Sequence, residues 1–212
     1  MVSGEQLYEV SEECTVSSLT RRTVLQMGAG LAAAGALPCA ANAASGQRSG
    51  WRTHVERALP EIDRPQRLYI KNDRTGDVFN DIVKQGPLVF EDAYADLDHL
   101  MRDWRREETI SMDRGLIDLL LTVQNEIGHD QPITLISGYR SKSTNEMLRR
   151  RIRKVAKNSY HMKGMAVDMR IKGVSTGAIR QIALHQRAGG VGYYPSKGFI
   201  HLDTGPVRTW RG

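Results

Sequence analysis

Residues 159–173 read SYHMKGMAVDMRIKG, and this stretch predicts both a strand and the position of a chemical site. The run 165–171 is typical of a β-strand, whose successive side chains point to opposite faces. Asp168 would lie on one face, with apolar neighbours on the other. His161 lies in the turn before the strand, and Gly164 gives the backbone the freedom to fold that turn back. We therefore expect the imidazole of His161 and the carboxylate of Asp168 to meet.

A second predicted strand, FIHLD at residues 199–203, supplies a third candidate. Strand alternation places His201 and Asp203 on one face. Two histidines and one aspartate suit Zn²⁺ with its fourth tetrahedral position open, whereas a structural site would fill that position, usually with cysteine. Both cysteines of the chain precede residue 44, so composition favours a catalytic site. From spacing alone, a solvated or structural role for these side chains stays open.

The first 43 residues are typical of an export signal. Arg21 and Arg22 precede the weakly apolar run GAGLAAAGAL, and Ala-Asn-Ala at 41–43 is a small-x-small cleavage site. This order favours a twin-arginine signal over a buried Ala/Gly-rich helix. The apolar run is too short to span a bilayer, so we expect no stable membrane span. The twin-arginine (Tat) export machinery is therefore an expected partner.

Residues 44–66 contain two prolines with several Ser and Gly residues, and we interpret them as a leader. The remainder, 67–212, is long enough to form one domain. The whole chain carries a formal net charge of +6. A basic exported domain finds acidic partners in the cell wall. No RNA-recognition or zinc-finger pattern is present, so nucleic acid is not an expected partner.

The remaining periodicity predicts an α+β fold, a small antiparallel sheet packed against helices. We expect a hairpin over 67–83, helices over 91–108 and 113–127, a strand over 133–136, a helix from Ser143 or Thr144 to about Lys154, a helix over 176–187, and the two strands described above. GGVGYYP at 189–195 is predicted to be a turn. Its Tyr193 and Tyr194 could form an aromatic wall beside the last strand or simply pack in a hairpin.

Four segments of the chain resemble a known group of enzymes. SYHMKGMAVD matches the Ser-x-His-x-x-Gly-x-Ala-x-Asp pattern of zinc peptidases of the D-Ala-D-Ala carboxypeptidase and dipeptidase type, grouped by fold with lysostaphin-type enzymes and hedgehog. Ser-Gly-Tyr-Arg at 137–140 matches their upstream motif. More narrowly, LISGYRSKSTNEMLR, VAKNSYHMKGMAVD, RAGGVGYYP and FIHLDTGPVRTW resemble the murein endopeptidase K family of Gram-negative bacteria.

The resemblance implies a zinc peptidase fold and a periplasmic enzyme that hydrolyses peptide cross-links of peptidoglycan, including the L,D bond between two meso-diaminopimelate residues. It implies that His161, Asp168 and His201 ligate zinc. Arg140 would bind or polarise a carbonyl or carboxylate, for which its fork is suited. Ser159 would contact the substrate near the metal. We also expect substrate contacts from Ser137, Tyr139, Tyr193 and Tyr194.

One position departs from the broader family. Its carboxypeptidases usually carry a glutamate, the general base, three residues before the last histidine, where this chain has Gly198. Asp203 is the leading candidate for the base, and orientation of a ligand or loop is the alternative. A D,D-carboxypeptidase or dipeptidase acting on free stem ends, and a non-catalytic wall-binding module, stay open as other functions.

Overall fold

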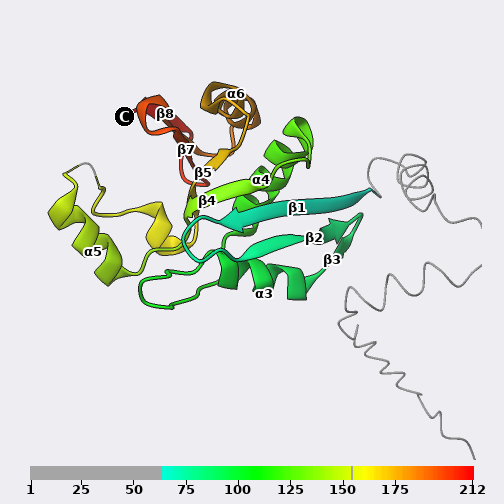
Figure 1. Cartoon of the computed structure of the whole chain (residues 1–212), viewed down its shortest axis with the longest axis horizontal. Coiled ribbons are helices and arrows are strands. Elements are labelled where there is room, and N and C mark those ends of the chain that lie inside the picture. The colour runs from blue at the N-terminus through cyan, green and yellow to red at the C-terminus, as the bar shows by residue number, and fades with distance from the viewer. Residues whose placement is uncertain (1–63, 154) are drawn as a thin grey trace, which may run out of the picture.

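The computed structural model describes residues 64–212 except residue 154 (Figure 1). The predicted export signal and nearly all of the predicted leader lie outside the described residues. In the described part of the chain, no helix is both long and apolar enough to cross a membrane.

The fold is α+β, with one eight-stranded mixed sheet in the order β3-β2-β1-β4-β5-β7-β6-β8. The strands are β1 (Pro65–Asn72), β2 (Val78–Gln85), β3 (Leu88–Val89), β4 (Ile133–Ser137), β5 (Ala166–Ile171), β6 (Gly190–Tyr194), β7 (Phe199–Asp203) and β8 (Arg208–Arg211). The α-helices are α3 (Glu91–Leu100), α4 (Arg114–Ile127), α5 (Lys142–Arg151) and α6 (Thr176–Gln186), and the 3₁₀ helices are η2 (Tyr160–Lys163) and η3 (Pro195–Lys197).

The prediction of a small antiparallel sheet is wrong. Strands β1 and β4 pair in parallel, as do β6 and β8, and the sheet is larger because β3, β6 and β8 were not predicted. The segment 189–195, predicted to be a turn, contains β6. Its three glycines hide the period-2 pattern of a strand, and the pairing of β6 with β7 supplies the regularity that local sequence lacks.

The ends of two helices also differ from the predictions. Helix α3 ends at Leu100. Three residues later, Asp103 is buried and accepts hydrogen bonds from the backbone N–H and the hydroxyl of Ser141, and the chain leaves the helical path to make these contacts. Helix α5 begins at Lys142, earlier than predicted, because the Ser141 hydroxyl caps it by accepting from the N–H of Thr144. It ends at Arg151.

The predicted helix over 113–127 is confirmed as α4. Asp113 accepts a hydrogen bond from the N–H of Leu116 at 3.0 Å, and Gly128 ends the helix with a positive φ. Its apolar face contributes to the main core, together with the apolar face of the central strands.

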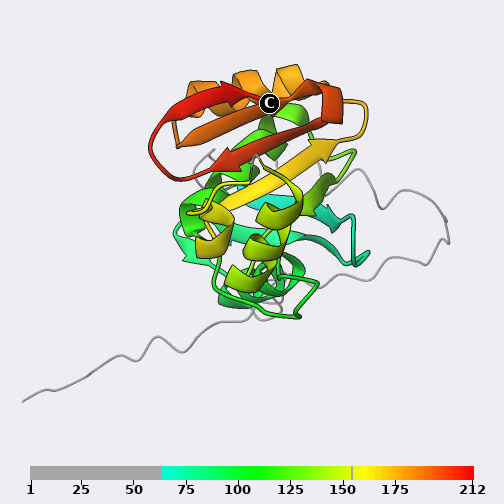
Figure 2. The ribbon, with the colours of Figure 1, turned by 90° about the vertical axis from the view of Figure 1, so that its left-hand side faces the viewer.

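The apolar side of strand β5 faces this core. Val167 and Met169 are fully buried in it, so Asp168 projects from the opposite face, as predicted. Helices α4 and α6 contact one another, whereas α5 and η2 lie apart from them, beside the carboxylate-bearing face of β5 (Figures 1 and 2). Most of the predicted site residues line a cleft on this side of the sheet, and Leu148 of α5 lines it as well.

Candidate metal centre

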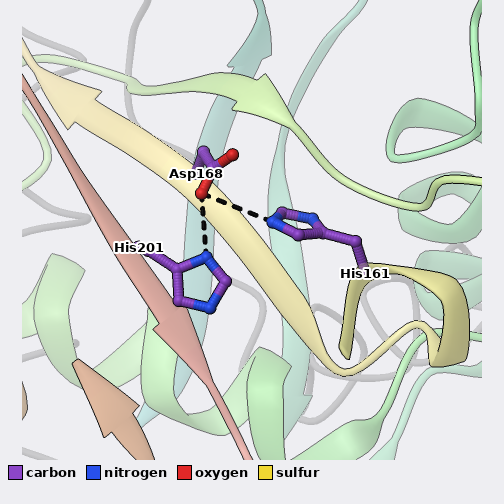
Figure 3. A group of neighbouring side chains, drawn as sticks. All are labelled: His161, Asp168 and His201. Carbon is purple, nitrogen blue, oxygen red and sulfur yellow. Dashed lines mark hydrogen bonds and ion pairs between the residues drawn. The ribbon is translucent and has the colours of Figure 1, made fainter. Parts of the chain in front are cut away.

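The side chains of His161, Asp168 and His201 converge on one point from three separate elements (Figure 3). One ligand atom from each lies within 4.8 Å of the others. The carboxylate Oδ1 of Asp168 is 2.9 Å from Nδ1 of His201 and 3.4 Å from Nε2 of His161. The three residues predicted as metal ligands are therefore brought together; we call them the metal cluster.

Strand pairing and one turn bring the cluster together. In the antiparallel pairing of β5 with β7, Asp168 lies directly opposite His201. His161 is carried by η2, which ends at Gly164 in the left-handed conformation, with φ of 68°. A side chain at this position would be strained, and its Cβ would lie 3.0 Å from the carbonyl oxygen of Ser111. The turn predicted from Gly164 therefore has the expected geometry.

Each histidine of the cluster is held by a hydrogen bond from its outer ring nitrogen, the one that does not face Asp168. His161 Nδ1 lies 2.7 Å from the carbonyl oxygen of Gly138, which can only accept, so Nδ1 donates. His201 Nε2 donates in the same way to the carboxylate of Asp203 at 2.9 Å. His161 Nε2 and His201 Nδ1 are then the ring nitrogens that face Asp168 and are placed to bind a metal ion. Histidine ligands of metals characteristically donate their other N–H to a carbonyl or carboxylate, so the residues present fit a zinc ion.

Burial and charge favour the ligand forms of two of these groups. Burial, together with the positive charge of Arg140, lowers the pKa of His161 to about 4, so its imidazole is neutral at pH 7. Burial alone would raise the pKa of Asp168, but its interactions with His161, His201 and the guanidinium group of Arg140 hold that pKa well below its usual range. A neutral imidazole and a carboxylate are the forms that bind a metal ion.

The pKa of His201 is shifted in the opposite direction, upward. Burial lowers its pKa, but its hydrogen bonds to Asp168 and Asp203 outweigh burial and raise the pKa above the ordinary value. A proton on Nδ1 and a metal ion would compete for the same lone pair.

Asp203 lies behind the ring of His201 and has no exposed surface. Its Oδ1 accepts from the N–H groups of Gly190 and Gly205, and Arg208 donates to both of its oxygens, at 2.9 and 2.7 Å. Burial raises the pKa of Asp203, but its hydrogen bonds with His201, Arg208 and the N–H of Gly205 outweigh burial and hold the pKa far below the ordinary value. This geometry matches the alternative role of orienting a ligand. That Asp203 is the general base stays a prediction.

Arg140 lies beside the metal cluster. Its Nη2 donates to Oδ2 of Asp168, and its Nε donates to the hydroxyl of Ser137 at 2.8 Å. The side chain is 14% exposed, and both residues line a cleft of about 710 Å³ that opens over the cluster. Ser137 therefore positions Arg140.

The other predicted substrate contacts divide into two groups. Ser159 and Tyr194 line the cleft. Tyr139 and Tyr193 are not among its lining residues: Tyr139 packs against the main core, and Tyr193 contacts the guanidinium groups of Arg180 and Arg211. Strand alternation separates Tyr193 from Tyr194, since adjacent residues of β6 face opposite ways.

Aromatic side chains form one side of the cleft. Tyr194 stacks on Phe199 at 4.5 Å between ring centroids, and its hydroxyl accepts from the indole N–H of Trp210 at 2.9 Å. A Cβ at Gly192 would lie 2.5 Å from the Trp210 ring, so glycine is required there. We call Tyr194, Phe199 and Trp210 the aromatic side; of the two tyrosines in GGVGYYP, only Tyr194 belongs to it.

Several residues of the cleft were not predicted. They are Arg74, Arg105, Tyr160, Lys197, Phe199, Arg208 and Trp210. Phe199 could have been found from the alternation of its strand, which places it on the face of His201. Arg74 and Arg105 follow β1 and α3, and no local pattern connects them with the cluster.

Known proteins match most of this chain. The family model described as "Peptidoglycan L,D-endopeptidase MepK" matches residues 61–210. The protein of that name from Escherichia coli (strain K12) is 46% identical over 147 residues, which are 69% of this chain and 81% of the relative. The "Probable peptidoglycan L,D-endopeptidase MepK" of Haemophilus influenzae is 43% identical over 156 residues, 73% of this chain and 84% of the relative. The chain therefore belongs to the peptidoglycan L,D-endopeptidase MepK family, as the resemblance of its four segments predicted.

Proposed function

We propose that this chain is a zinc-dependent endopeptidase that hydrolyses peptide cross-links of peptidoglycan, including L,D bonds between diaminopimelate residues. Its family is one of peptidoglycan-hydrolysing metallopeptidases, and the names of its relatives specify L,D-endopeptidases. The observation that carries the proposal is the metal cluster. Two histidines held by their outer nitrogens and one carboxylate converge at a cleft large enough for peptide.

The residues have separable roles. His161 Nε2, a carboxylate oxygen of Asp168 and His201 Nδ1 would hold the ion. When bound, zinc would supply a Lewis acid for the scissile carbonyl and lower the pKa of water at the site. Arg140, held by Ser137 and Asp168, presents a guanidinium group beside the cluster. It would stabilise the negative charge that develops on the carbonyl oxygen during hydrolysis, and being already held in place, it needs little reorganisation.

Asp203 would act through His201. Its hydrogen bond to Nε2 fixes the tautomer whose Nδ1 lone pair faces the cluster, and Arg208 compensates its buried charge. Gly198, at the position of the usual glutamate, has φ of 67°, a conformation that disfavours any other residue. The backbone conformation of this loop therefore favours glycine at position 198.

We also propose that the chain works in the periplasm after export by the Tat machinery. Support comes from the paired arginines, apolar run and cleavage site in residues 1–43. A fusion of residues 1–50 to a reporter that is active only when exported in folded form tests this. Export should depend on Arg21 and Arg22, and export that survives Arg21→Lys with Arg22→Lys would contradict the proposal.

The function is tested by digesting purified cross-linked peptidoglycan with zinc-loaded mature protein, with and without chelator, and separating the products by chromatography and mass spectrometry. Conversion of cross-linked dimers to monomers that stops with chelator is the expected result. The linkages of the dimers that disappear identify the bond, and we expect the L,D-linked dimers to be lost.

Other outcomes would contradict the proposal. Shortened stems with intact cross-links would indicate a carboxypeptidase. Binding of peptidoglycan without any new product would indicate a wall-binding module. Cleavage that persists after complete removal of metal would eliminate the metal cluster as the catalytic centre.

A further inference from the structure

The strand order places two groups of cleft-lining residues on opposite sides of the metal cluster. In the sheet, β5 and β7 carry Asp168 and His201 at the middle of the cleft. Strands β6 and β8 lie to one side and contribute to the aromatic side. Toward β1 the lining residues are instead Arg74, in the turn after β1, and Arg105, in the loop after α3. We call these two residues the arginine side.

The charges that line the cleft are unbalanced. Asp168 is its one lining carboxylate in the described part of the chain, and it is paired with Arg140. Arg208 is paired with Asp203. Among residues 64–212 without 154, the lining cations Arg74, Arg105 and Lys197 have no carboxylate within salt-bridge distance, and Lys197 lies on the aromatic side, over the ring of Tyr194. The guanidinium of Arg105 lies over the ring of Trp104, at 4.2 Å from its centroid, which positions the group without neutralising it.

The cations of this region repel one another. Burial, together with the nearby positive charges of Arg140, Arg74 and Arg151, lowers the pKa of Arg105, against the attraction of Asp103. Bringing an anion to these side chains relieves the repulsion, so it is favoured beyond the direct contacts that the anion makes.

Both arginines are carried by turns that buried polar residues hold in place. The backbone N–H of Arg74 donates to the side chain of Asn72, which is 3% exposed and donates to the carbonyl of Leu100 at 2.8 Å. The N–H of Arg105 donates to Asp103, which is 2% exposed. The anchor of each turn is therefore fixed, and only the long side chain must be ordered on binding.

We propose that Arg74 and Arg105 bind a free carboxylate of the substrate peptide on one side of the bond that is cut. This rests on the proposed function, because it names the part of the substrate that this end of the cleft selects. An L,D cross-link joins a carboxyl group of one diaminopimelate residue to an amino group of the other, so each of the two residues keeps a free carboxylate at its D centre. A guanidinium group matches a carboxylate with two parallel hydrogen bonds, and two such groups discriminate strongly against an uncharged amide.

Binding of reaction products tests this without relying on catalysis. The probe is a disaccharide tripeptide that ends in meso-diaminopimelate, compared with the same compound amidated on the diaminopimelate carboxylate at the D centre. Dissociation constants are measured by calorimetry for the zinc-loaded protein and for Arg74→Gln with Arg105→Gln. The matched control is Arg149→Gln with Arg150→Gln, which removes the same charge from exposed positions of α5 outside the cleft lining.

We expect the variant with both Arg74→Gln and Arg105→Gln to bind the probe that is not amidated more weakly, on the order of tenfold or more, since hydrogen bonds to charged groups are lost. Its affinity for the amidated probe should stay close to that of the wild type, and the control should bind both probes normally. Equal weakening for both probes would indicate general attraction of anions and overturn the proposal. Unchanged affinity for the free carboxylate would overturn it as well.

Hydrolysis then separates this inference from the proposed function. In the double variant, KM for cross-linked dimers should rise while kcat changes little. If the wild type cleaves dimers but the two arginines affect neither affinity nor KM, only the inference fails. If the wild type cleaves nothing but discriminates between the probes through the arginines, the inference holds and the endopeptidase function fails.

Discussion

The metal cluster and the arginine side lie in one cleft but are built differently. In the cluster, both histidines and Asp168 have partners for their polar atoms, and the partners are themselves buried or held. On the arginine side, Arg74 and Arg105 are exposed and have no carboxylate partner among the described residues. A reacting centre needs fixed geometry, whereas a recognition surface needs charge that only the ligand completes.

Removal of a metal-binding side chain should have the largest effect on zinc content and activity. His161→Ala deletes one of three ligand side chains and leaves Asp168 and His201 unable to hold zinc tightly. We expect bound zinc to fall from about one ion per chain to near zero, with loss of hydrolysis, because affinity depends on ligand count. Metal content after dialysis, measured by mass spectrometry of the elements, checks this.

His185→Ala is the matched control for that experiment. His185 is exposed on α6, does not line the cleft, and should leave both zinc content and activity unchanged. Full activity of His161→Ala without bound metal would show that the cluster is not the catalytic centre.

Asp203→Asn should have the next largest effect and tests how the cluster is held. The amide keeps an acceptor for His201 Nε2 but loses the charge that Arg208 pairs with. Loss of such a partner weakens metal binding by about 10- to 100-fold. Competition with a coloured chelator gives the affinity, and the rate at saturating zinc should recover most of its wild-type value. Asp130→Asn, at an exposed site, is the control.

The opposite pattern would favour the base role of Asp203. If zinc affinity is normal and the rate stays low at saturating zinc, Asp203 takes part in the reaction itself. Asp203 would then belong to the reacting groups and not to the residues that support the metal cluster.

Asp103→Asn should reduce stability on the arginine side. The carboxylate is buried and accepts hydrogen bonds from Ser141 and the N–H of Arg105. Loss of its charge should lower the free energy of unfolding by about 2 kcal/mol at pH 7, the cost of leaving buried donors poorly satisfied. Urea unfolding measures this, and Asp130→Asn again serves as the control.

The same variant predicts a pH dependence. Burial raises the pKa of Asp103, but the hydroxyl of Thr144 and the groups of Ser141 outweigh it, and the folded-state pKa is lowered. A lowered pKa contributes stability that is present above the unfolded value, near 4, and is lost as pH falls through the folded value. The difference between wild type and variant should therefore shrink below about pH 4. A difference that grows on acidification would contradict this.

The smallest effect is expected on the aromatic side. Tyr194→Phe removes the hydroxyl that accepts from Trp210, while the ring that stacks on Phe199 remains. We expect KM to rise by a factor of about two to five, as for the loss of one neutral hydrogen bond, with kcat nearly unchanged. Tyr193→Phe should leave both constants unchanged, because Tyr193 does not line the cleft. Equal effects of the two changes would show that both tyrosines contact substrate.

Local periodicity determined the centre of this molecule. The period-2 alternation of 165–171 and 199–203 placed Asp168 and His201 on the strand faces opposite the apolar core, and Gly164 indicated the turn that returns His161. The helix 113–127, with Asp113 as its cap, was predictable for the same reason. Each of these features depends on residues a few positions apart, whose spacing alone sets the direction of their side chains.

Pairing between distant segments decided the rest. Strands β6 and β8 are recognisable only beside β7 and one another, because glycines and polar residues conceal their pattern. The parallel pairing of β1 with β4 enlarged the sheet beyond the predicted size. Strand alternation predicted that Asp203 lies on the same face as His201. The structure showed that Asp203 binds Nε2 of the His201 ring and that Arg208 donates hydrogen bonds to Asp203. Arg74 and Arg105 are 31 positions apart and meet only at the cleft, because long-range contacts set which charges become neighbours.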